Sequence, residues 1–230
     1  MDTVRLPDGT PPAVYFVDLD GTLITTSSEK FFLKHLVSRR ILAPHLIAGF
    51  LLRYLLHPAR TVSEGKGWNR SYLKEISPDR VKREANICAG MLLKNSIRNW
   101  TMRSMLELRR YGCRIVLLSA SLEYIVEAVA ENLPVDDICA SSPEIIDNKF
   151  TGNLVEIRPW GKNKVELAVN ICKRYGTKMT ECIAAGDSWS DRYLMAECGS
   201  SVAVCPDRRL KKLAAKANWR TVNCRHTKWA

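Results

Sequence analysis

Four short apolar runs constrain most strongly what this chain can fold into. They occupy Val14–Val17, Arg114–Leu118, Glu181–Ala185 and Ser201–Val204. Their length and β-branched residues predict buried strands. Amphipathic helical patterns separate them, at 97–111, 122–132, 162–175 and 191–197. Because consecutive parallel strands need crossover connections, this alternation predicts an α/β fold with a Rossmann-like, doubly wound parallel sheet.

The alternation is interrupted directly after the first strand. Residues 27–95 are rich in helical patterns and contain no convincing strand. We therefore expect an inserted helical cap subdomain at 27–95 and an α/β core built from residues 1–26 and 96–230. Within the core, 136–140 is a weaker strand candidate, and 144–156 is expected to form a β-hairpin that turns near Asp147-Asn148 or near Thr151-Gly152-Asn153.

One cap segment, Ile41–His57, is strongly apolar. It is about seventeen residues long and contains Pro44, His45 and Arg53, whereas a membrane span needs ~20 predominantly apolar residues. A span is therefore excluded. A cap helix packed against the protein is the expected arrangement, and a helix lying on a membrane surface is the alternative.

Basic residues outnumber acidic ones, with 35 Lys and Arg against 24 Asp and Glu and a net charge of +11. Much of the excess lies at 206–230, where eight basic side chains accompany the single acid Asp207. A basic end favours anionic partners, such as phosphorylated substrates or an anionic membrane surface. Specific nucleic-acid binding is not expected, because no nucleic-acid motif is present. The simplest account of this end is an amphipathic helix at 208–217 that closes the sheet.

The eight cysteines include no Cys-x-x-Cys pair, which argues against a zinc knuckle or a redox dithiol. Several, including Cys182 and Cys205, lie in apolar runs, where a thiol behaves as a small buried apolar group. Residues 1–10 lack the apolar stretch of a signal peptide. These features favour a cytoplasmic location, with peripheral membrane attachment as a possibility left open by the apolar cap segment.

The first strand runs directly into Asp18-Leu19-Asp20-Gly21-Thr22. In an extended segment, side chains two residues apart share one face, and two carboxylates on one face suit a hard divalent cation. Gly21 permits a tight turn after them. Open α/β sheets bind ligands at the carboxyl ends of their strands, which is where this pair lies. The plain alternative is an acidic turn at the end of a strand.

A second acidic pair follows the third strand, in Gly186-Asp187-Ser188-Trp189-Ser190-Asp191. Asp187 is expected to project from the same sheet edge as Asp18. Carboxylates gathered there would repel one another unless a cation neutralised them. A structural alternative is that Asp187 or Ser190 caps the next helix.

Two weaker signals are also compatible with phosphate binding. Ser119-Ala120-Ser121 ends the second strand and opens the next helical pattern, so its hydroxyls and backbone N–H groups could cradle a phosphate. Gly161-Lys162-Asn163-Lys164 begins a helix and could place an ammonium near a phosphoryl group. A serine N-cap and a solvated lysine are the corresponding structural alternatives.

Taken in order, these four motifs resemble those of the haloacid dehalogenase superfamily of phosphohydrolases, from Val14 to about Arg220. The helical cap placed after the first motif resembles the phosphoserine phosphatase-like branch. The resemblance implies that Asp18 is the nucleophile and that Asp20 is the general acid and base. It also implies Mg²⁺ as cofactor, held by Asp18, the Asp20 backbone carbonyl and Asp187, with Asp191 supporting the metal or orienting the lysine.

The same resemblance implies that Ser119 and Lys164 are catalytic residues that stabilise the phosphoryl oxygens. Whether Lys162 or Lys164 is the phosphate-binding lysine is left open, although the Gly-x-x-Lys spacing favours Lys164. The remaining phosphate-binding positions would be Gly21, Thr22, Ala120 and Ser121.

The expected function is magnesium-dependent hydrolysis of a small phosphomonoester through an aspartyl-phosphate. Alternatives are a phosphotransferase or phosphomutase, a phosphatidylglycerophosphate-like lipid phosphatase at a membrane surface, and a binding protein without activity. Phosphoserine phosphatases carry a cap glutamate nine residues after the nucleophile. Here that position is Ser27, and the nearest acid is Glu29. Arg70, also in the cap, is expected to be a surface arginine, and contact with a substrate anion is the alternative.

Overall fold

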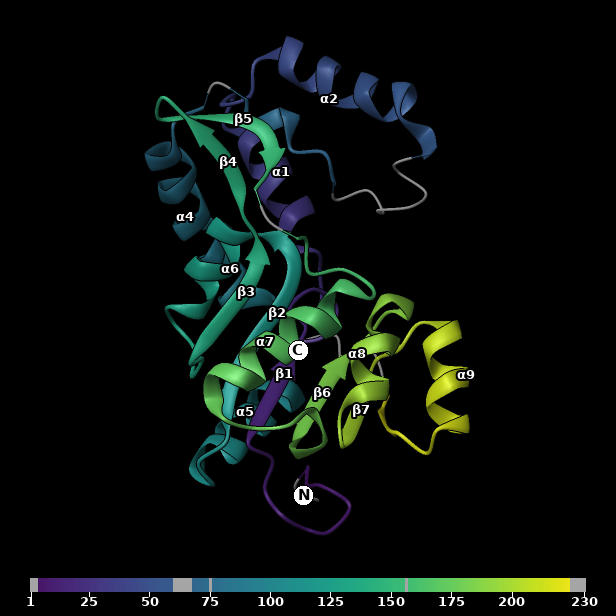
Figure 1. Cartoon of the computed structure of the whole chain (residues 1–230). Coiled ribbons are helices and arrows are strands. Elements are labelled where there is room, and N and C mark those ends of the chain that lie inside the picture. The colour runs from purple at the N-terminus through teal and green to yellow at the C-terminus, as the bar shows by residue number, and fades with distance from the viewer. Residues whose placement is uncertain (1–3, 60–67, 75, 156, 224–230) are drawn as a thin grey trace.

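The computed structural model describes residues 4–59, 68–74, 76–155 and 157–223 (Figure 1). Residues 224–230, which include Arg225 and Lys228 among the eight basic side chains of the basic end, lie outside this part.

The core is a six-stranded sheet in the order β3-β2-β1-β6-β7-β8, and every neighbouring pair is parallel. The strands are β1 (Val14–Val17), β2 (Arg114–Leu122), β3 (Asp137–Ser141), β6 (Cys182–Gly186), β7 (Ser200–Val204) and β8 (Arg220–Val222). The α/β fold with a doubly wound parallel sheet, expected from the sequence, is confirmed. The short edge strand β8 was not predicted.

Helices cover both faces of this sheet. They are α5 (Asn99–Arg110), α6 (Glu123–Ala130), α7 (Asn163–Tyr175), α8 (Arg192–Glu197) and α9 (Arg208–Lys216). Side chains of β1 alternate between the two layers: Tyr15 and Val17 belong to one apolar cluster and Phe16 to the other. The first cluster includes α5 and α6, and the second includes α7, α8 and α9. All four residues of β1 are buried, which explains its uninterrupted apolar sequence.

The cap contains α1 (Ser28–Ser38), α2 (Pro44–Leu56), the short 3₁₀ helix η2 (Ser71–Leu73) and α4 (Pro78–Ser96). Together with the hairpin of β4 (Pro143–Ile146) and β5 (Lys149–Leu154), it lies above the carboxyl ends of the core strands (Figure 1). The hairpin turns at Asp147-Asn148, both with positive φ, as one of the two expected turns. The division at 26/27 and 95/96 stays a prediction.

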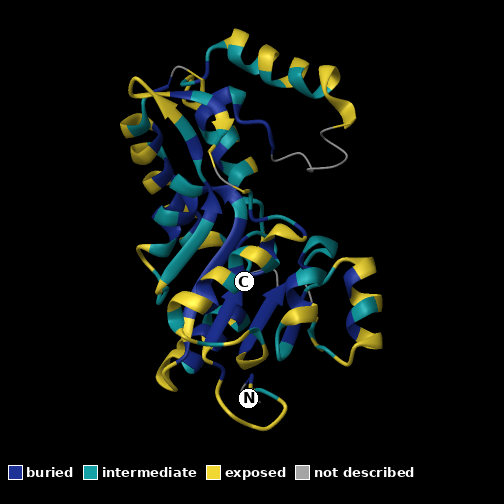
Figure 2. Cartoon of the chain, viewed as in Figure 1, coloured by how far each residue is buried: buried dark blue, intermediate teal, exposed yellow. Residues whose placement is uncertain are grey.

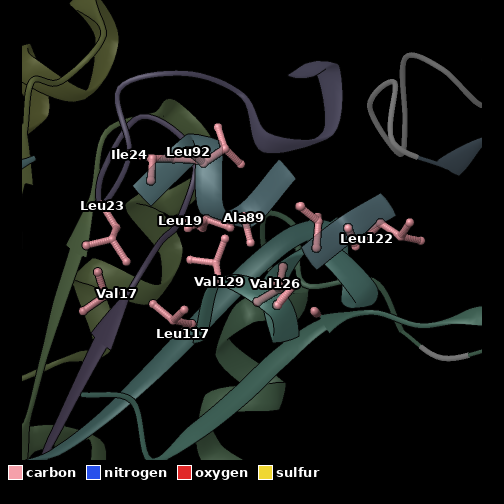
Figure 3. Close-up of a cluster of buried hydrophobic side chains, with 14 of the residues drawn as sticks. Val17, Leu19, Leu23, Ile24, Ala89, Leu92, Leu117, Leu122, Val126 and Val129 are labelled. Atoms are coloured by element: carbon pink, nitrogen blue, oxygen red, sulfur yellow. The ribbon is translucent and has the colours of Figure 1, made fainter. Parts of the chain in front are cut away.

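The cap and the core share one apolar cluster (Figure 3). Leu19 and Ile24 from the segment after β1 lie close to Ala89 and Leu92 of α4, and Val126 of α6 lies beside them. All five side chains are buried. The cap base is therefore fixed to the core by apolar packing next to the acidic motif.

The expectation that the Ile41–His57 segment is packed holds for one face only. Leu42 is buried, and Ile47 and Phe50 of α2 pack against the apolar core. On the other face, Leu51, Leu52, Leu55 and Leu56 are between 51% and 77% exposed (Figure 2). Among the described residues, no helix is both long and apolar enough to cross a membrane.

The described cysteines fall into two groups. Cys88, Cys113, Cys139, Cys172, Cys182 and Cys198 are free thiols, and four of these are buried. Cys205 is disulfide-bonded, contrary to its expected role as a buried apolar thiol. A disulfide is rare in a reducing compartment and so does not favour a cytoplasmic location. That location stays a prediction.

Candidate active site

The acidic motifs meet where the strand order of the sheet reverses. Strand β1 lies between β2 and β6, so its carboxyl end is a topological switch point. Asp18 follows β1, and its backbone N–H donates to the Ala185 carbonyl of β6 (3.1 Å). Asp187 follows β6 directly. Asp18 and Asp187 therefore lie at the same edge of the sheet, as predicted.

Lys164 connects two of the carboxylates. Its Nζ lies 2.7 Å from Asp18 Oδ1 and 2.7 Å from Asp191 Oδ1. Lys164 and Asp191 are buried. Burial alone would lower the pKa of the lysine, but Asp18 and Asp191 outweigh this effect and raise it, so the ammonium stays charged.

Asp18, Asp187 and Asp191 form a carboxylate cluster whose oxygen atoms lie within 4.8 Å of one another. One ammonium faces these three acids. Burial raises the pKa of Asp18 well above its usual range, and burial together with Asp191 raises the pKa of Asp187 to about 7. An all-oxygen donor set with excess negative charge fits a hard divalent cation. These residues therefore fit the metal implied by the resemblance.

The Asp20 carboxylate points away from that cluster. Its Oδ2 accepts hydrogen bonds from Ser27 Oγ (3.1 Å) and Ser121 Oγ (2.9 Å), and its Oδ1 accepts one from the Ser28 backbone N–H (2.9 Å). The Asp20 side chain is therefore not part of the carboxylate cluster. The resemblance assigns only the backbone carbonyl of Asp20 to the metal, and that assignment stays a prediction. Ser27 also caps α1. A cap helix and strand β2 consequently position Asp20.

Gly21 and Thr22 shape the turn that carries the two aspartates. Thr22 Oγ1 lies 3.3 Å from Asp187 Oδ1 and 3.5 Å from Asp18 Oδ2, so its hydroxyl bridges the two acidic motifs. The Arg98 Nε donates to the Gly21 carbonyl (2.8 Å), which fixes the turn to the residue before α5.

Replacing Gly21 by alanine should disturb the carboxylate cluster. Gly21 has φ +84°, and a Cβ would lie 2.1 Å from Asp187 Oδ2. Gly112 provides the control, since its φ is +82° and a Cβ there would meet nothing within 4 Å. We expect Gly112→Ala to cost about 1–2 kcal/mol of unfolding free energy through the backbone alone. Gly21→Ala should cost more and also reduce activity, as urea unfolding and turnover would show. Equal effects of the two substitutions would contradict the close packing of Asp187.

The Ser119–Ser121 segment differs from its expected local structure. Strand β2 continues to Leu122, so Ser119 lies within the strand and α6 begins at Glu123. The register between β2 and β3 shifts between Leu118 and Leu122, which indicates a bulge. Ser119 Oγ accepts a hydrogen bond from the Ser121 backbone N–H (3.2 Å). Within this bulge, Ser121 reaches the site, because its Oγ donates to Asp20 Oδ2 (2.9 Å).

The two candidate lysines have different surroundings. Lys164 is the second residue of α7 and reaches the buried carboxylates, whereas Lys162 precedes the helix and is exposed. The Lys162 ammonium lies 5.6 Å from the centre of the Tyr193 ring. Only Lys164 is brought to the acidic cluster.

Arg70 is buried, contrary to the expected surface position, and its contact with a substrate anion stays a prediction. Only 1% of its side chain is exposed, and its Nη1 lies 2.8 Å from Glu29 Oε1. Its Nη2 donates to the Ala120 carbonyl (3.3 Å). Burial raises the pKa of Glu29, although Arg70 and Arg158 oppose this effect. Arg70 is thus a buried cap cation that touches the Ser119–Ser121 segment of the core. No local pattern around Asn69-Arg70 signals this.

A cleft of about 1290 Å³ adjoins the carboxylate cluster. Ser188, next to Asp187, and Asn163, next to Lys164, contribute to its lining. Its other lining residues include Trp68 and Leu154 on the cap side and Trp160 on the core side. Asp18, Lys164, Asp187 and Asp191 do not line the cleft themselves. Ser188 connects the two, because its Oγ donates to Asp191 Oδ2 (2.8 Å).

Comparison with protein families identifies the group to which this arrangement belongs. Residues 15–196 match the model of the haloacid dehalogenase-like hydrolases. The chain belongs to this family. The match includes the segments that carry Asp18, Ser119, Lys164 and Asp187.

Curated relatives of the family support the narrower placement. A phosphoserine phosphatase of Mycobacterium tuberculosis is 24% identical over 222 residues, covering 92% of this chain and 72% of the relative. A probable phosphatase from the same species is 27% identical over 239 residues, covering 94% and 77%. The expectations of the phosphoserine phosphatase-like branch and of a phosphoric monoester hydrolase are confirmed.

Solved structures show the same fold. A Bordetella pertussis protein of unknown function has a TM-score of 0.80 at 18% identity, covering 93% of this chain and 99% of that protein. A phosphoserine phosphatase with a phospho-aspartyl intermediate analogue has a TM-score of 0.63 at 18% identity, covering 94% and 95%.

Proposed function

We propose that this hydrolase is a magnesium-dependent phosphomonoesterase that acts through an aspartyl-phosphate on Asp18. The observation that carries the proposal is the position of Asp18, which lies at the switch point of the sheet, faces the carboxylate cluster and contacts the Lys164 ammonium. The family match and the phosphatase relatives add support.

In the first step, a carboxylate oxygen of Asp18 attacks the phosphorus of the substrate. An O–P bond to Asp18 forms as the bond to the ester oxygen breaks, and Asp20 gives a proton to that leaving oxygen. In the second step, Asp20 takes a proton from water, which attacks phosphorus and releases Asp18 and phosphate. The hydroxyls of Ser27 and Ser121 both donate and accept, so they can hold either form of Asp20.

Three side chains stabilise the negative charge on the phosphoryl oxygens. Lys164 supplies a buried ammonium, and Ser119 and Ser121 supply hydroxyls from the β2 bulge. Gly21, Thr22 and Ala120 complete the proposed phosphate site. Mg²⁺ held by Asp18, the Asp20 carbonyl and Asp187, with Asp191 in support, would neutralise charge on the substrate oxygens.

The substrate is proposed to be small and phosphorylated, and its identity is open within that class. Where the phosphoserine phosphatases carry their cap glutamate, Ser27 instead caps α1 and contacts Asp20. Glu29 is paired with Arg70 and accepts from Tyr72 Oη (3.4 Å). A phosphotransferase or phosphomutase would use the same first step and deliver the phosphoryl group to an acceptor other than water.

The experiment that tests this proposal is phosphate release from a panel of monoesters, with magnesium and with a chelator. The panel should contain an aryl phosphate, phosphoserine, sugar phosphates, nucleotides and a phosphatidylglycerophosphate analogue. We expect magnesium-dependent turnover of at least one member. Folded protein that releases no phosphate from any of them would favour a transferase or a protein that only binds.

The stability of the metal-free protein should depend on pH because of Asp187. The pKa of this carboxyl is raised to about 7, against ~3.9 in an unfolded chain. Between these values the folded state binds the extra proton, so stability falls as pH rises from about 4 to 7. The full effect is at most about 4 kcal/mol. Thermal unfolding in chelator should show this fall, and magnesium should reduce it above pH 7.

The control for that experiment is Asp187→Asn, which removes the titrating group while preserving its size. Its unfolding temperature should vary less with pH than that of the wild type, and magnesium should stabilise it less. A wild-type unfolding temperature that instead rises between pH 5 and pH 7 in chelator would contradict the assigned pKa shift.

A further inference from the structure

Helix α2 exposes apolar side chains on the face that is turned away from the cap. A surface helix normally directs its apolar side chains inward and its polar ones outward. In α2, the four leucines Leu51, Leu52, Leu55 and Leu56 are exposed by 57%, 51%, 77% and 64%. They lie side by side over the last two turns, and none of the thirteen residues of the helix is buried.

The face of α2 that carries Phe50 and Arg53 is turned toward the protein. Arg53 lies with its guanidinium 5.2 Å from the Trp68 ring centre, and its Nη1 donates to the Gly152 carbonyl of β5 (3.4 Å). The Phe50 ring packs edge-on against Tyr72 at 5.2 Å, and the Phe50 carbonyl accepts from the Asn69 amide (2.9 Å). The inward face is therefore anchored to the cap, and the leucines are left on the opposite side.

The segment that leads into and through this helix carries only basic charge. From Lys30 to Ala59 the sequence contains no Asp or Glu and five Lys and Arg. Arg53 faces the cap, whereas Lys30 and Lys34 on α1 and Arg39 and Arg40 directly after it are exposed. An apolar face flanked by basic residues and free of acids is complementary to anionic lipid headgroups.

The neighbouring hairpin adds exposed apolar groups at the same end of the molecule. The tips of β4 and β5 extend away from the core beside the cap helices (Figure 1). Ile145 and Ile146 are 42% and 57% exposed, and the turn exposes one acid, Asp147, and one base, Lys149. Arg53 connects this hairpin to α2 through Gly152.

We propose that α2 docks on the surface of a bilayer rich in anionic lipids, with Leu51, Leu52, Leu55 and Leu56 inserted at the headgroup–acyl boundary. The helix is about 20 Å long, so it can lie in the interface and cannot span the bilayer. A second copy of the chain is a poorer occupant, because it would bring two acid-free basic segments together.

Docking through α2 would also orient the substrate cleft. Trp68 lines this cleft and contacts α2, with Tyr54 at 5.8 Å and His57 at 5.8 Å between ring centres. A bilayer that holds the outer face of α2 would therefore lie close to the cap side of the cleft.

Sedimentation with lipid vesicles tests the proposal without reference to enzymatic activity. The full chain would be mixed with vesicles of equal parts phosphatidylglycerol and phosphatidylcholine, and with vesicles of phosphatidylcholine alone. The test variant is Leu52→Ser/Leu55→Ser, which preserves charge. The control is Ile87→Ser/Leu106→Ser, which removes two other leucine-sized groups that are 44% and 43% exposed on α4 and α5.

We expect the wild type and the control to bind the anionic vesicles, and the α2 variant to bind at least about tenfold more weakly. Binding should weaken as salt is added. Absence of wild-type binding at low salt, equal binding to neutral vesicles, or an unchanged α2 variant would each overturn the proposal. So would a wild-type dimer that the α2 substitutions convert to a monomer without any vesicle binding, since a second copy would then cover this face.

Discussion

Asp18→Asn is expected to reduce phosphate release by about 10⁴-fold or more, because the amide has no charged oxygen to attack phosphorus. The substitution preserves the size and shape of the side chain. Lys164 retains its contact with Asp191 at 2.7 Å. The loss should therefore appear in kcat, with circular dichroism and unfolding temperature showing a folded protein.

Stability and trapping measurements separate this role from a structural one. Burial already raises the pKa of Asp18, so a neutral side chain at this position should leave the unfolding free energy unchanged or higher. Acid quenching of the wild type during turnover should trap phosphate on the protein, and the same quench of Asp18→Asn should trap none. Equal trapping in the two proteins, or a variant with more than a tenth of wild-type activity, would contradict nucleophilic attack by Asp18.

The core could be predicted from the sequence because its elements are specified locally. Strand β1 is a run of four apolar residues between Pro-Pro and Asp18, and its side chains fill both faces of the sheet. In a parallel sheet such a run has few alternative placements. The three-residue edge strand β8 escaped prediction because Arg220-Thr221-Val222 is too short and too polar to show a strand pattern.

The part of the site that could be predicted is the part that the order of the strands in the sheet determines. Asp18 and Asp187 follow strands that are neighbours in the sheet, so their proximity follows from strand order. Residues that depend on tertiary packing of the cap were not found. Arg70 is buried only because Glu29 and the Ala120 carbonyl meet it from two other elements. Helix α2 packs as predicted on the face of Ile47 and Phe50. The exposure of its leucines was not predicted, because an apolar sequence alone does not show which side chains are covered.

The second large effect is expected for Lys164→Met. This substitution removes the ammonium from between Asp18 and Asp191 and leaves two carboxylates facing each other at low exposure. Removing one partner of a buried ion pair lowers the unfolding free energy by about 3–5 kcal/mol, because the other charge is left buried and unpaired. Loss of a charge that stabilises the phosphoryl oxygens should also lower kcat by about 10²–10³-fold. Urea unfolding and steady-state kinetics would measure the two effects.

Lys162→Met is the matched control because Lys162 lies two residues away and is exposed. It should change stability by less than about 0.5 kcal/mol, as for other exposed positions, and leave kcat close to that of the wild type. Its position on the cleft allows an effect on KM. Added magnesium should recover part of the stability lost in Lys164→Met, because a cation at the cluster offsets the same repulsion between carboxylates. If Lys162→Met lowered kcat more than Lys164→Met, the phosphate-binding role would belong to Lys162, and the contacts of Lys164 with Asp18 and Asp191 would be structural.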